Sequence, residues 1–284
     1  MTDSTQAPSP DETPVCPRHR DRVSYVRCQR CGRPTCPECQ RPAPVGIQCV
    51  DCVAAGARAT APRATFGEGR VSQRPTVTLT VIGLCALAYV AQLTVPGFTG
   101  QWAFFAVLGA DEPWRFLTAA FLHSPSGFMH IVLNMVALWA VGPYLETSLG
   151  RARYITLYLL SALGGSTAMV VWADLSGAWF TAVVGASGAV FGLFGAVLVV
   201  LRRTGRSARG IIAVVALNTV IGFLVPGIAW QAHLGGLVVG ALLGTAYAYA
   251  PRHRRRTVSI TASVTAGVVL VLVAVGVYAS VGLI

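Results

Sequence analysis

The chain has 284 residues, of which 12% are charged and 54% hydrophobic, and its mean hydropathy is +0.61. An ordinary soluble domain carries about 25% charged residues, so this composition argues against a water-soluble globule and is typical of a membrane protein. The net charge of +11 comes from arginine alone, because the chain has no lysine. The arginines stand singly or in short clusters between apolar runs, which fits membrane topology; no nucleic-acid partner is expected.

Composition divides the chain into four parts. Residues 1–12 are polar and proline-rich, as in a disordered tail, and they lack the apolar stretch of a secretion signal, so the amino terminus is expected to stay in the cytoplasm. Residues 13–55 hold most of the cysteines. Residues 56–75, rich in Ala, Gly, Arg and Thr, are interpreted as a flexible linker. Residues 76–284 form the membrane domain.

The cysteine-rich segment contains four ligand pairs, each with two residues between its members. These pairs are Cys16 with His19, Cys28 with Cys31, Cys36 with Cys39, and Cys49 with Cys52. Eight such ligands make two tetrahedral structural zinc sites, whose four protein ligands leave no open position for catalysis. Disulfides are the alternative. We favour zinc, because the cytoplasm keeps thiols reduced and a short segment with few apolar residues needs metal to fold.

The pairing of these ligands is open between a sequential and an interleaved arrangement, since only four residues separate the second pair from the third. We favour interleaving, in which the first and third pairs hold one ion and the second and fourth pairs hold the other. The pattern resembles a B-box-type zinc finger, although cysteines replace the later histidines of that family. A cytoplasmic protein partner of this domain is a further expectation.

Seven apolar runs after residue 75 approach the length of about 20 residues that a helix needs to cross a bilayer. The expected spans are residues 77–95, 128–145, 154–173, 186–201, 210–225, 230–250 and 259–281. The fourth and fifth are short, so they need tilt or burial among their neighbours. The predicted fold is an all-α polytopic membrane protein with seven transmembrane helices and a small N-terminal zinc-binding domain. With the amino terminus inside, every arginine except Arg115 is cytoplasmic, as expected for a protein of the cell membrane.

Polar side chains within the spans are few, and each is a functional candidate because hydrocarbon disfavours it. His130 and Asn134 lie one turn apart on the second span, while Ser187 begins the fourth span and His233 the sixth. These three spans all enter from the outer side. The two histidines and the serine therefore lie at a similar shallow depth, on the order of 5–10 Å below the outer surface.

Glycines with near-helical spacing indicate that the fourth and sixth spans pack closely, because small residues let membrane helices approach backbone to backbone. These glycines are Gly188, Gly192 and Gly195 on the fourth span and Gly236, Gly240 and Gly244 on the sixth. Such packing would bring Ser187 within hydrogen-bonding reach of His233. A serine beside a histidine is a nucleophile with its general base.

The remaining polar groups complete a candidate catalytic site. His130 and Asn134 would donate hydrogen bonds to an oxyanion together with the Ser187 backbone N–H. Phe191, one turn after Ser187, is placed to stack on the imidazole of His233. No acidic residue lies near these positions in the sequence, so the site is interpreted as a dyad rather than a triad.

These residues fall into four short motifs. They are Trp114-Arg115, His130-x3-Asn134 followed by Glu146 and Gly150, Gly185-Ala186-Ser187-Gly188, and Ala232-His233-x2-Gly236-x3-Gly240. On these motifs, residues 76–284 resemble a rhomboid intramembrane serine protease. One departure is Phe191, since relatives often have tyrosine at this position.

The resemblance implies a six-helix core with one added C-terminal helix, lying in membrane lipid. It implies that Ser187 and His233 form the catalytic dyad, that His130 and Asn134 hold the oxyanion, and that substrates are single-pass transmembrane proteins cut near the outer face. The expected supporting residues are Gly185, Phe191, Gly236 and Gly240. Two alternatives are a catalytically inactive relative that binds membrane clients and a membrane-anchored zinc-finger adaptor. The first predicts loss of the serine or histidine, and the second leaves the polar layer unexplained.

Overall fold

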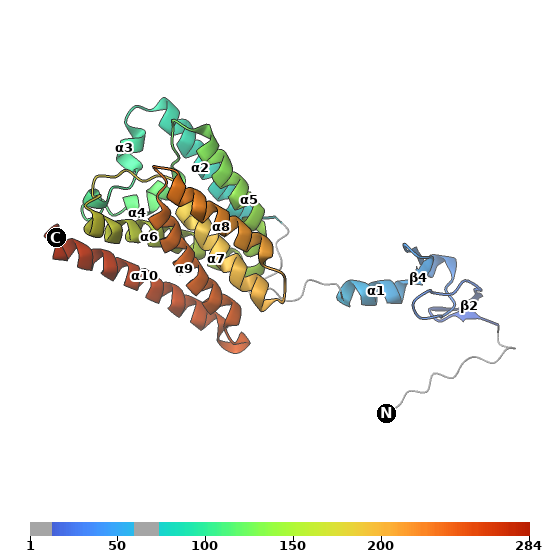
Figure 1. The fold of residues 1–284 in the computed structure, drawn as a ribbon. Helices are drawn as coiled ribbons and strands as arrows, with labels where there is room; N and C mark the ends of the chain where they lie inside the picture. The colour runs from blue at the N-terminus through green and yellow to red at the C-terminus, as the bar shows by residue number, and fades with distance from the viewer. Residues whose placement is uncertain (1–12, 60–73) are drawn as a thin grey trace. The chain divides into compact units, whose positions relative to one another are not determined.

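The computed structural model describes residues 13–59 and 74–284 (Figure 1). The described residues fall into two compact units, one within the first 63 residues and one within residues 64–284. The predicted tail, 1–12, and residues 60–73 of the predicted linker lie outside the described residues.

The N-terminal unit is built from two small antiparallel ladders and one helix. Its elements are β1 (Val15–Cys16), β2 (His19–Val23), η1 (Pro37–Cys39), β3 (Gln40–Pro42), β4 (Ile47–Cys49) and α1 (Val50–Ala59). Strand β1 pairs with β2, and β3 pairs with β4. Every buried apolar side chain described in this unit is a cysteine. The unit therefore has no hydrophobic core of its own beyond its candidate metal ligands.

Helix α1 corrects one predicted boundary. The linker is expected to begin at residue 56, yet the helix continues to Ala59. The physical reason is local composition, because alanine and arginine are strong helix formers and residues 54–59 contain little else.

Seven longer helices form the C-terminal unit, and each overlaps one predicted span. They are α2 (Thr76–Thr94), α5 (Phe128–Leu149), α6 (Arg151–Ser176), α7 (Ser187–Arg203), α8 (Arg209–Leu224), α9 (Trp230–Tyr249) and α10 (Arg255–Ser280). Five of them are long and apolar enough to cross a membrane by length and composition. These are α2, α5, α6, α9 and α10, the last taken together with the 3-10 turn before it. Helices α7 and α8 have only 17 and 16 residues. Five of the seven predicted spans thus meet this criterion, and the count of seven stays a prediction.

The two short helices differ in their surroundings. Helix α7 packs against α5, α6, α8 and α9, and every residue from Gly188 to Val197 is buried. Protein rather than lipid thus surrounds most of α7, in agreement with the burial expected of a short span. Helix α8 buries only Gly222, so burial does not explain the shortness of the fifth span.

A buried carboxylate fixes the direction of α2 against α5. Glu146, near the end of α5, accepts hydrogen bonds from the backbone N–H groups of Val77 (3.0 Å) and Thr78 (2.9 Å) and from the Thr78 hydroxyl (2.9 Å). The first N–H groups of a helix have no partner within the helix, and a negative charge there is favourable. The start of α2 therefore lies beside the end of α5, which makes the two helices antiparallel.

The connection between α2 and α5 folds into short helical pieces and does not span. It contains α3 (Phe98–Trp102), η2 (Ala106–Leu108), α4 (Arg115–Thr118) and η3 (Ala119–Phe121). Arg115 is buried within it, where it pairs with Glu112 and donates to the carbonyls of Gly100 and Ala103, both at 2.7 Å. The arginine thus ties successive turns of this connection together.

Candidate active site and metal-binding clusters

Ser187 and His233 lie in hydrogen-bonding contact at the starts of two neighbouring helices. Ser187 is the first residue of α7 and His233 the fourth of α9. The distance from Ser187 Oγ to His233 Nε2 is 2.9 Å. A nucleophile and a general base need this geometry for proton transfer.

Glycines allow this contact. A Cβ added to Gly236 would overlap the carbonyl of Gly188, and a Cβ added to Gly240 would overlap the carbonyl of Gly192. The backbones of α7 and α9 therefore touch at two successive turns. Gly236 and Gly240, two of the predicted supporting residues, therefore lie at this helix interface and do not line the cavity described below.

The ring of His233 is held from one face and bonded at one edge. Phe191 stacks on it with a centroid distance of 4.2 Å and an angle of 8° between the rings. His233 Nδ1 is buried and has no hydrogen-bond partner among the described residues. No carboxylate among them contacts the imidazole, so Ser187 and His233 form a pair without a third member.

His130 faces the same point from α5. The backbone N–H of Ser124 donates to His130 Nδ1 at 3.1 Å, so a neutral His130 carries its proton on Nε2. A Cβ added to Gly185 would lie 3.0 Å from His130 Nε2 and 3.4 Å from Ser187 Oγ. Both polar atoms therefore converge on Gly185, whose φ of +136° also favours glycine.

Asn134 lies one turn further along α5. Its side-chain nitrogen donates to the carbonyl of His130 at 2.9 Å, which leaves the second hydrogen of the amide group for another acceptor. A cavity of about 860 Å³ is lined by Asn134, His130, Gly185, Ser187, Phe191 and His233. The structure thus brings together the four polar residues that the sequence singles out.

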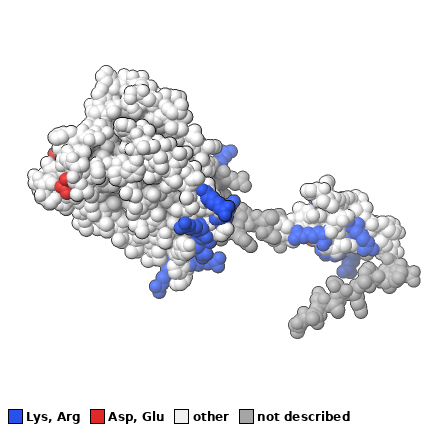
Figure 2. Space-filling view, in the orientation of Figure 1, with Lys and Arg blue, Asp and Glu red and all other residues white. Residues whose placement is uncertain are grey.

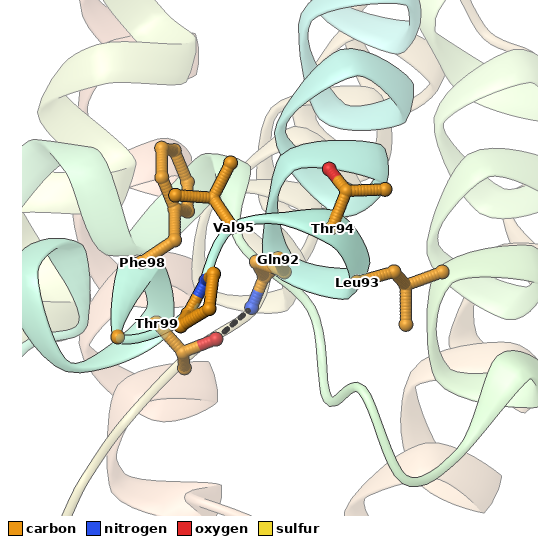
Figure 3. Close-up of a pocket in the computed structure, with 8 residues that line it drawn as sticks. Gln92, Leu93, Thr94, Val95, Phe98 and Thr99 are labelled. Atoms are coloured by element: carbon orange, nitrogen blue, oxygen red, sulfur yellow. Dashed lines mark hydrogen bonds between the residues drawn. The ribbon is translucent and has the colours of Figure 1, made fainter.

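Gln92 of α2 is a polar contact that sequence reasoning missed. Its side-chain nitrogen donates to the carbonyl of His123 (2.7 Å) and to Thr99 Oγ1 (3.0 Å; Figure 3), and its oxygen accepts from the N–H of His123 (2.9 Å). The next residue in the chain is Ser124, whose backbone N–H donates to His130 Nδ1. An amide inside an apolar span is the one signal that could have identified Gln92.

His123, in the connection between α2 and α5, packs against the candidate site. Its ring is fully buried and packs edge-on against His130 with centroids 5.3 Å apart. Neither ring nitrogen has a hydrogen-bond partner among the described residues. The ring therefore acts as a packing surface behind His130.

The cysteine pairs of the N-terminal unit form two clusters, and their grouping is interleaved. One cluster contains Cys16, His19, Cys36 and Cys39, and the other contains Cys28, Cys31, Cys49 and Cys52. Within each cluster the ligand atoms lie within 4.8 Å of one another. All eight cysteines of the chain are free of disulfide bonds. The sequential pairing is therefore excluded by the geometry.

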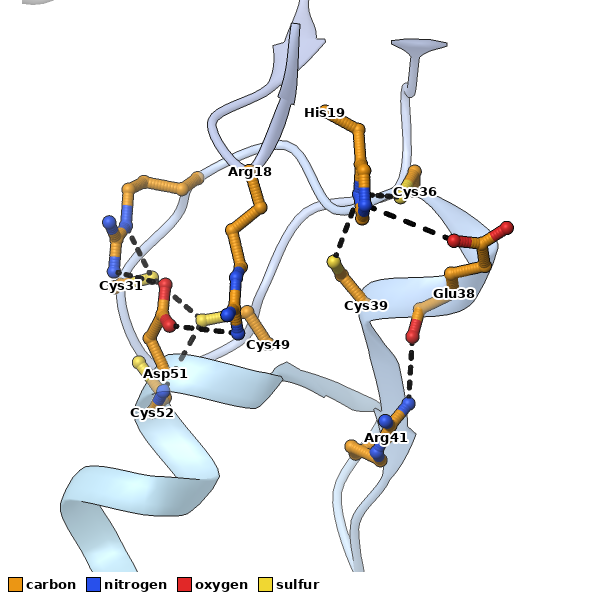
Figure 4. Close-up of polar contacts among 11 residues, drawn as sticks. Arg18, His19, Cys31, Cys36, Glu38, Cys39, Arg41, Cys49, Asp51 and Cys52 are labelled. Carbon is orange, nitrogen blue, oxygen red and sulfur yellow. Dashed lines mark hydrogen bonds and ion pairs between the residues drawn. The ribbon is translucent and has the colours of Figure 1, made fainter.

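The spacing of the ligand atoms fits a tetrahedral ion. Metal–sulfur bonds of about 2.3 Å would place two sulfurs about 3.8 Å apart, and the Sγ atoms of Cys31 and Cys49 are 3.8 Å apart. His19 Nδ1 lies 3.3 Å from the sulfur of Cys36 and 3.4 Å from that of Cys39. His19 Nε2, on the other side of the ring, lies 3.9 Å from the carboxylate of Glu38 (Figure 4).

The thiols of each cluster differ in how readily they lose a proton. Backbone N–H donation from Cys36 lowers the pKa of Cys16 to about 6, whereas burial and the neighbouring thiols raise the pKa of Cys39 to about 11. In the second cluster, the thiol of Cys31 and burial raise the pKa of Cys52 to about 12. One sulfur of each cluster thus resists ionisation beside its neighbours, and a bound cation would remove that resistance.

Comparison with known proteins identifies the family. The Rhomboid domain model matches residues 110–250. The chain is 35% identical over 149 residues to RHOMBOID-like protein 5 of Arabidopsis thaliana (50% of this chain, 46% of that protein). It is also 35% identical over 149 residues to Rhomboid protease GluP of Bacillus subtilis (strain 168). That match covers 50% of this chain and 27% of that protein.

A longer match is to Rhomboid protease GlpG of Salmonella newport (strain SL254), at 33% identity over 192 residues, covering 64% of this chain and 66% of that protein. The chain spans less than half the length of the Arabidopsis and Bacillus relatives. The cysteine clusters lie outside the residues that match the domain model. Residues 110–250 are a rhomboid domain, and the chain belongs through them to the rhomboid family of membrane proteins.

Proposed function

We propose that the chain is a serine-type intramembrane endopeptidase with Ser187 as nucleophile and His233 as general base. The observation that carries this proposal is the 2.9 Å contact between Ser187 Oγ and His233 Nε2 inside a cavity of about 860 Å³. The similarity to rhomboid proteases supports the same reaction class. An inactive client-binding protein, or an adaptor anchored in the membrane, has no need of this contact.

The proposed reaction follows from the positions of these groups. Ser187 Oγ attacks the carbonyl carbon of the scissile peptide bond while its proton passes to His233 Nε2, which then protonates the leaving amine. A water molecule, activated by the same nitrogen, hydrolyses the acyl-enzyme. The oxyanion is held by the Nε2–H of His130, the free amide hydrogen of Asn134 and the backbone N–H of Ser187.

The proposed substrates are single-pass transmembrane proteins, cut near the outer face of the cell membrane. The dyad lies at the start of α7 and α9, and the cavity around it admits the water that hydrolysis requires. We also propose that all seven long helices span the membrane and that the N-terminal unit is cytoplasmic. Figure 2 supports this orientation, because the basic side chains on the face that it shows of the C-terminal unit gather at one end.

The proposed metal of the N-terminal unit is zinc, with one structural ion in each cluster. Four thiolate and imidazole ligands with tetrahedral spacing favour this ion. Each zinc would supply the cohesion that a unit without a hydrophobic core lacks. The unit also exposes 79% of Tyr25 and 76% of Val45, and these side chains are available to a cytoplasmic protein partner.

The test is cleavage of a single-pass substrate by the purified full chain in liposomes. Ser187→Ala and His233→Ala should each abolish cleavage, and the double variant should be little worse than either, because both residues serve one step. Ser176→Ala is the matched control, since Ser176 lies at the exposed end of α6 and bonds only within its own helix. A fluorophosphonate should label the parent at Ser187. Undiminished cleavage by Ser187→Ala would refute the proposal.

A further inference from the structure

A second cavity lies at the opposite end of α7 from Ser187. It has a volume of about 440 Å³ and is lined by Ala140, Val141 and Tyr144 of α5, Val197 and Leu201 of α7, and Arg206 and Ser207 of the turn before α8. Leu201 is 14 residues after Ser187, which corresponds to about 20 Å along the helix. The cavity contains none of the groups placed in the proposed catalytic site.

The lining of this cavity is divided between apolar and polar groups. The two helices supply aliphatic side chains and the ring of Tyr144, while the turn supplies a guanidinium and a hydroxyl. The Ser207 oxygen accepts a long hydrogen bond from the N–H of Arg209 (3.5 Å), and its own hydrogen remains to be donated. A ligand that fits must therefore be apolar over most of its length and an acceptor at one end.

The turn holds Arg206 over the cavity. Gly205 has a φ of +69°, in the left-handed region, and the N–H of Arg206 donates to the carbonyl of Leu201 at 2.9 Å. This reversal places the guanidinium carbon 5.8 Å from the centre of the Tyr144 ring. The guanidinium has no hydrogen bond or ion pair with any residue in the part of the chain that the structure describes.

Charge complementarity determines the kind of ligand. Residues 175–284 contain no aspartate or glutamate, so no carboxylate of this region neutralises the turn. The same turn and its flanks carry three further arginines, namely Arg202, Arg203 and Arg209. Arginine at the edge of a bilayer attracts anionic headgroups, and a guanidinium binds phosphate oxygens through charge-assisted hydrogen bonds.

We propose that this cavity binds one anionic phospholipid. An acyl chain occupies the apolar space between α5 and α7, and the phosphate accepts hydrogen bonds from Arg206 and from the Ser207 hydroxyl. A free phosphate ion would satisfy the arginine but would leave the aliphatic lining without a partner. The surrounding bilayer, by contrast, supplies a molecule that carries both chemistries.

The test is native mass spectrometry of the full chain in detergent, with dioleoyl phosphatidylglycerol as the probe. The parent should retain one lipid, and Arg206→Gln should bind it about fivefold more weakly, as loss of one interfacial arginine predicts. Arg209→Gln is the matched control, because it removes the same charge from the same turn without altering the lining. Leu201→Trp fills the apolar part and should also weaken binding while Arg206 is intact.

Competing probes distinguish binding of a whole anionic lipid from binding of a phosphate group alone. Dioleoyl phosphatidylcholine should bind more weakly than phosphatidylglycerol, and millimolar inorganic phosphate should not displace the bound lipid. Equal retention by Arg206→Gln and the parent would overturn the proposal, as would equal weakening by Arg206→Gln and Arg209→Gln. Displacement by phosphate would assign the turn to a free anion instead. Thermal unfolding of each variant in detergent shows whether the fold is retained.

Discussion

The tautomer of a neutral His130 depends on one backbone amide and on the side chain that positions it. Ser124 N–H fixes the proton of His130 on Nε2, and Gln92 clamps the preceding residue through both its N–H and its carbonyl. Gln92 is therefore a positioning residue that acts through the backbone of residues 123 and 124. Gln92 as a whole is 9% exposed, so water has little access to its hydrogen bonds.

Gln92→Ala should slow turnover while leaving the Ser187–His233 contact intact. The change frees two buried backbone groups, which destabilises the fold by about 1–3 kcal/mol, and it releases the amide that holds His130. We expect kcat to fall more than KM rises, because in the proposed reaction the oxyanion that His130 would bind forms only after substrate has bound. Thr99→Val is the control, since it removes only the third hydrogen bond of Gln92. Equal kinetics for Gln92→Ala and Thr99→Val would contradict this role.

At the residue scale, chemistry could be predicted where a polar group interrupts an apolar sequence. Four residues stand out in this way, and in the structure they line one cavity. They are Ser187, His233, His130 and Asn134. The contacts of Gln92 could not be predicted, because they depend on the path of the chain that brings His123, 31 residues later, back beside α2. The composition of the sequence does not determine that path.

The close approach of helices α7 and α9 sets the distance between Ser187 and His233. At Gly240 a Cβ would overlap the backbone of Gly192, so no adjustment of a flexible side chain can relieve the clash. Gly240→Ala should therefore separate the helices, lower the stability by roughly 1–3 kcal/mol and reduce labelling of Ser187 by a fluorophosphonate.

Gly83→Ala is the matched control for this helix contact. Gly83 lies inside α2, and a Cβ there would meet nothing within 4 Å. The control should unfold at the parental temperature in detergent and label at the parental rate. If Gly240→Ala behaved like Gly83→Ala in both measurements, the close approach of α7 and α9 would have no part in forming the site.

At the element scale, the apolar runs located all seven long helices, but their ends shifted. Helix α5 continues past the predicted residue 145 to Leu149, so that Glu146 can bond the start of α2. Helix α6 begins at Arg151 instead of 154. Polar residues at these ends are stabilised by partners on other helices, and hydropathy along one segment does not contain that information.

At the scale of the whole molecule, metal content is the property that separates the two units. The parent should contain two zinc ions per chain, Cys39→Ser should retain one, and Cys85→Ser should retain both, because Cys85 lies buried in α2 and outside either cluster. Mass spectrometry under non-denaturing conditions measures all three. A content near zero in the parent would exclude the proposed zinc sites.

The same ions should be lost as the pH falls. Each ligand thiol must give up a proton to bind zinc, and in the absence of metal burial keeps the pKa of Cys39 at about 11, so protons compete with the metal throughout the acid range. Zinc release, followed with a chromogenic chelator, should therefore increase with each step to lower pH. Release that did not change between neutral and acid pH would contradict thiolate ligation.

The C-terminal unit should keep its catalytic geometry without the N-terminal unit. Every described contact that positions Ser187, His233 or His130 comes from residues 74–284: the helix interface of α7 and α9, the ring of Phe191 and the amide of Gln92. A chain consisting of residues 64–284 should therefore label at Ser187 with a fluorophosphonate at a rate close to that of the full chain. Cleavage of a given substrate is a separate measurement, since the N-terminal unit is free to influence substrate choice or regulation. A truncated chain that unfolds at the parental temperature yet fails to label would show that the N-terminal unit completes the site. The two units would then have to be treated as one catalytic body.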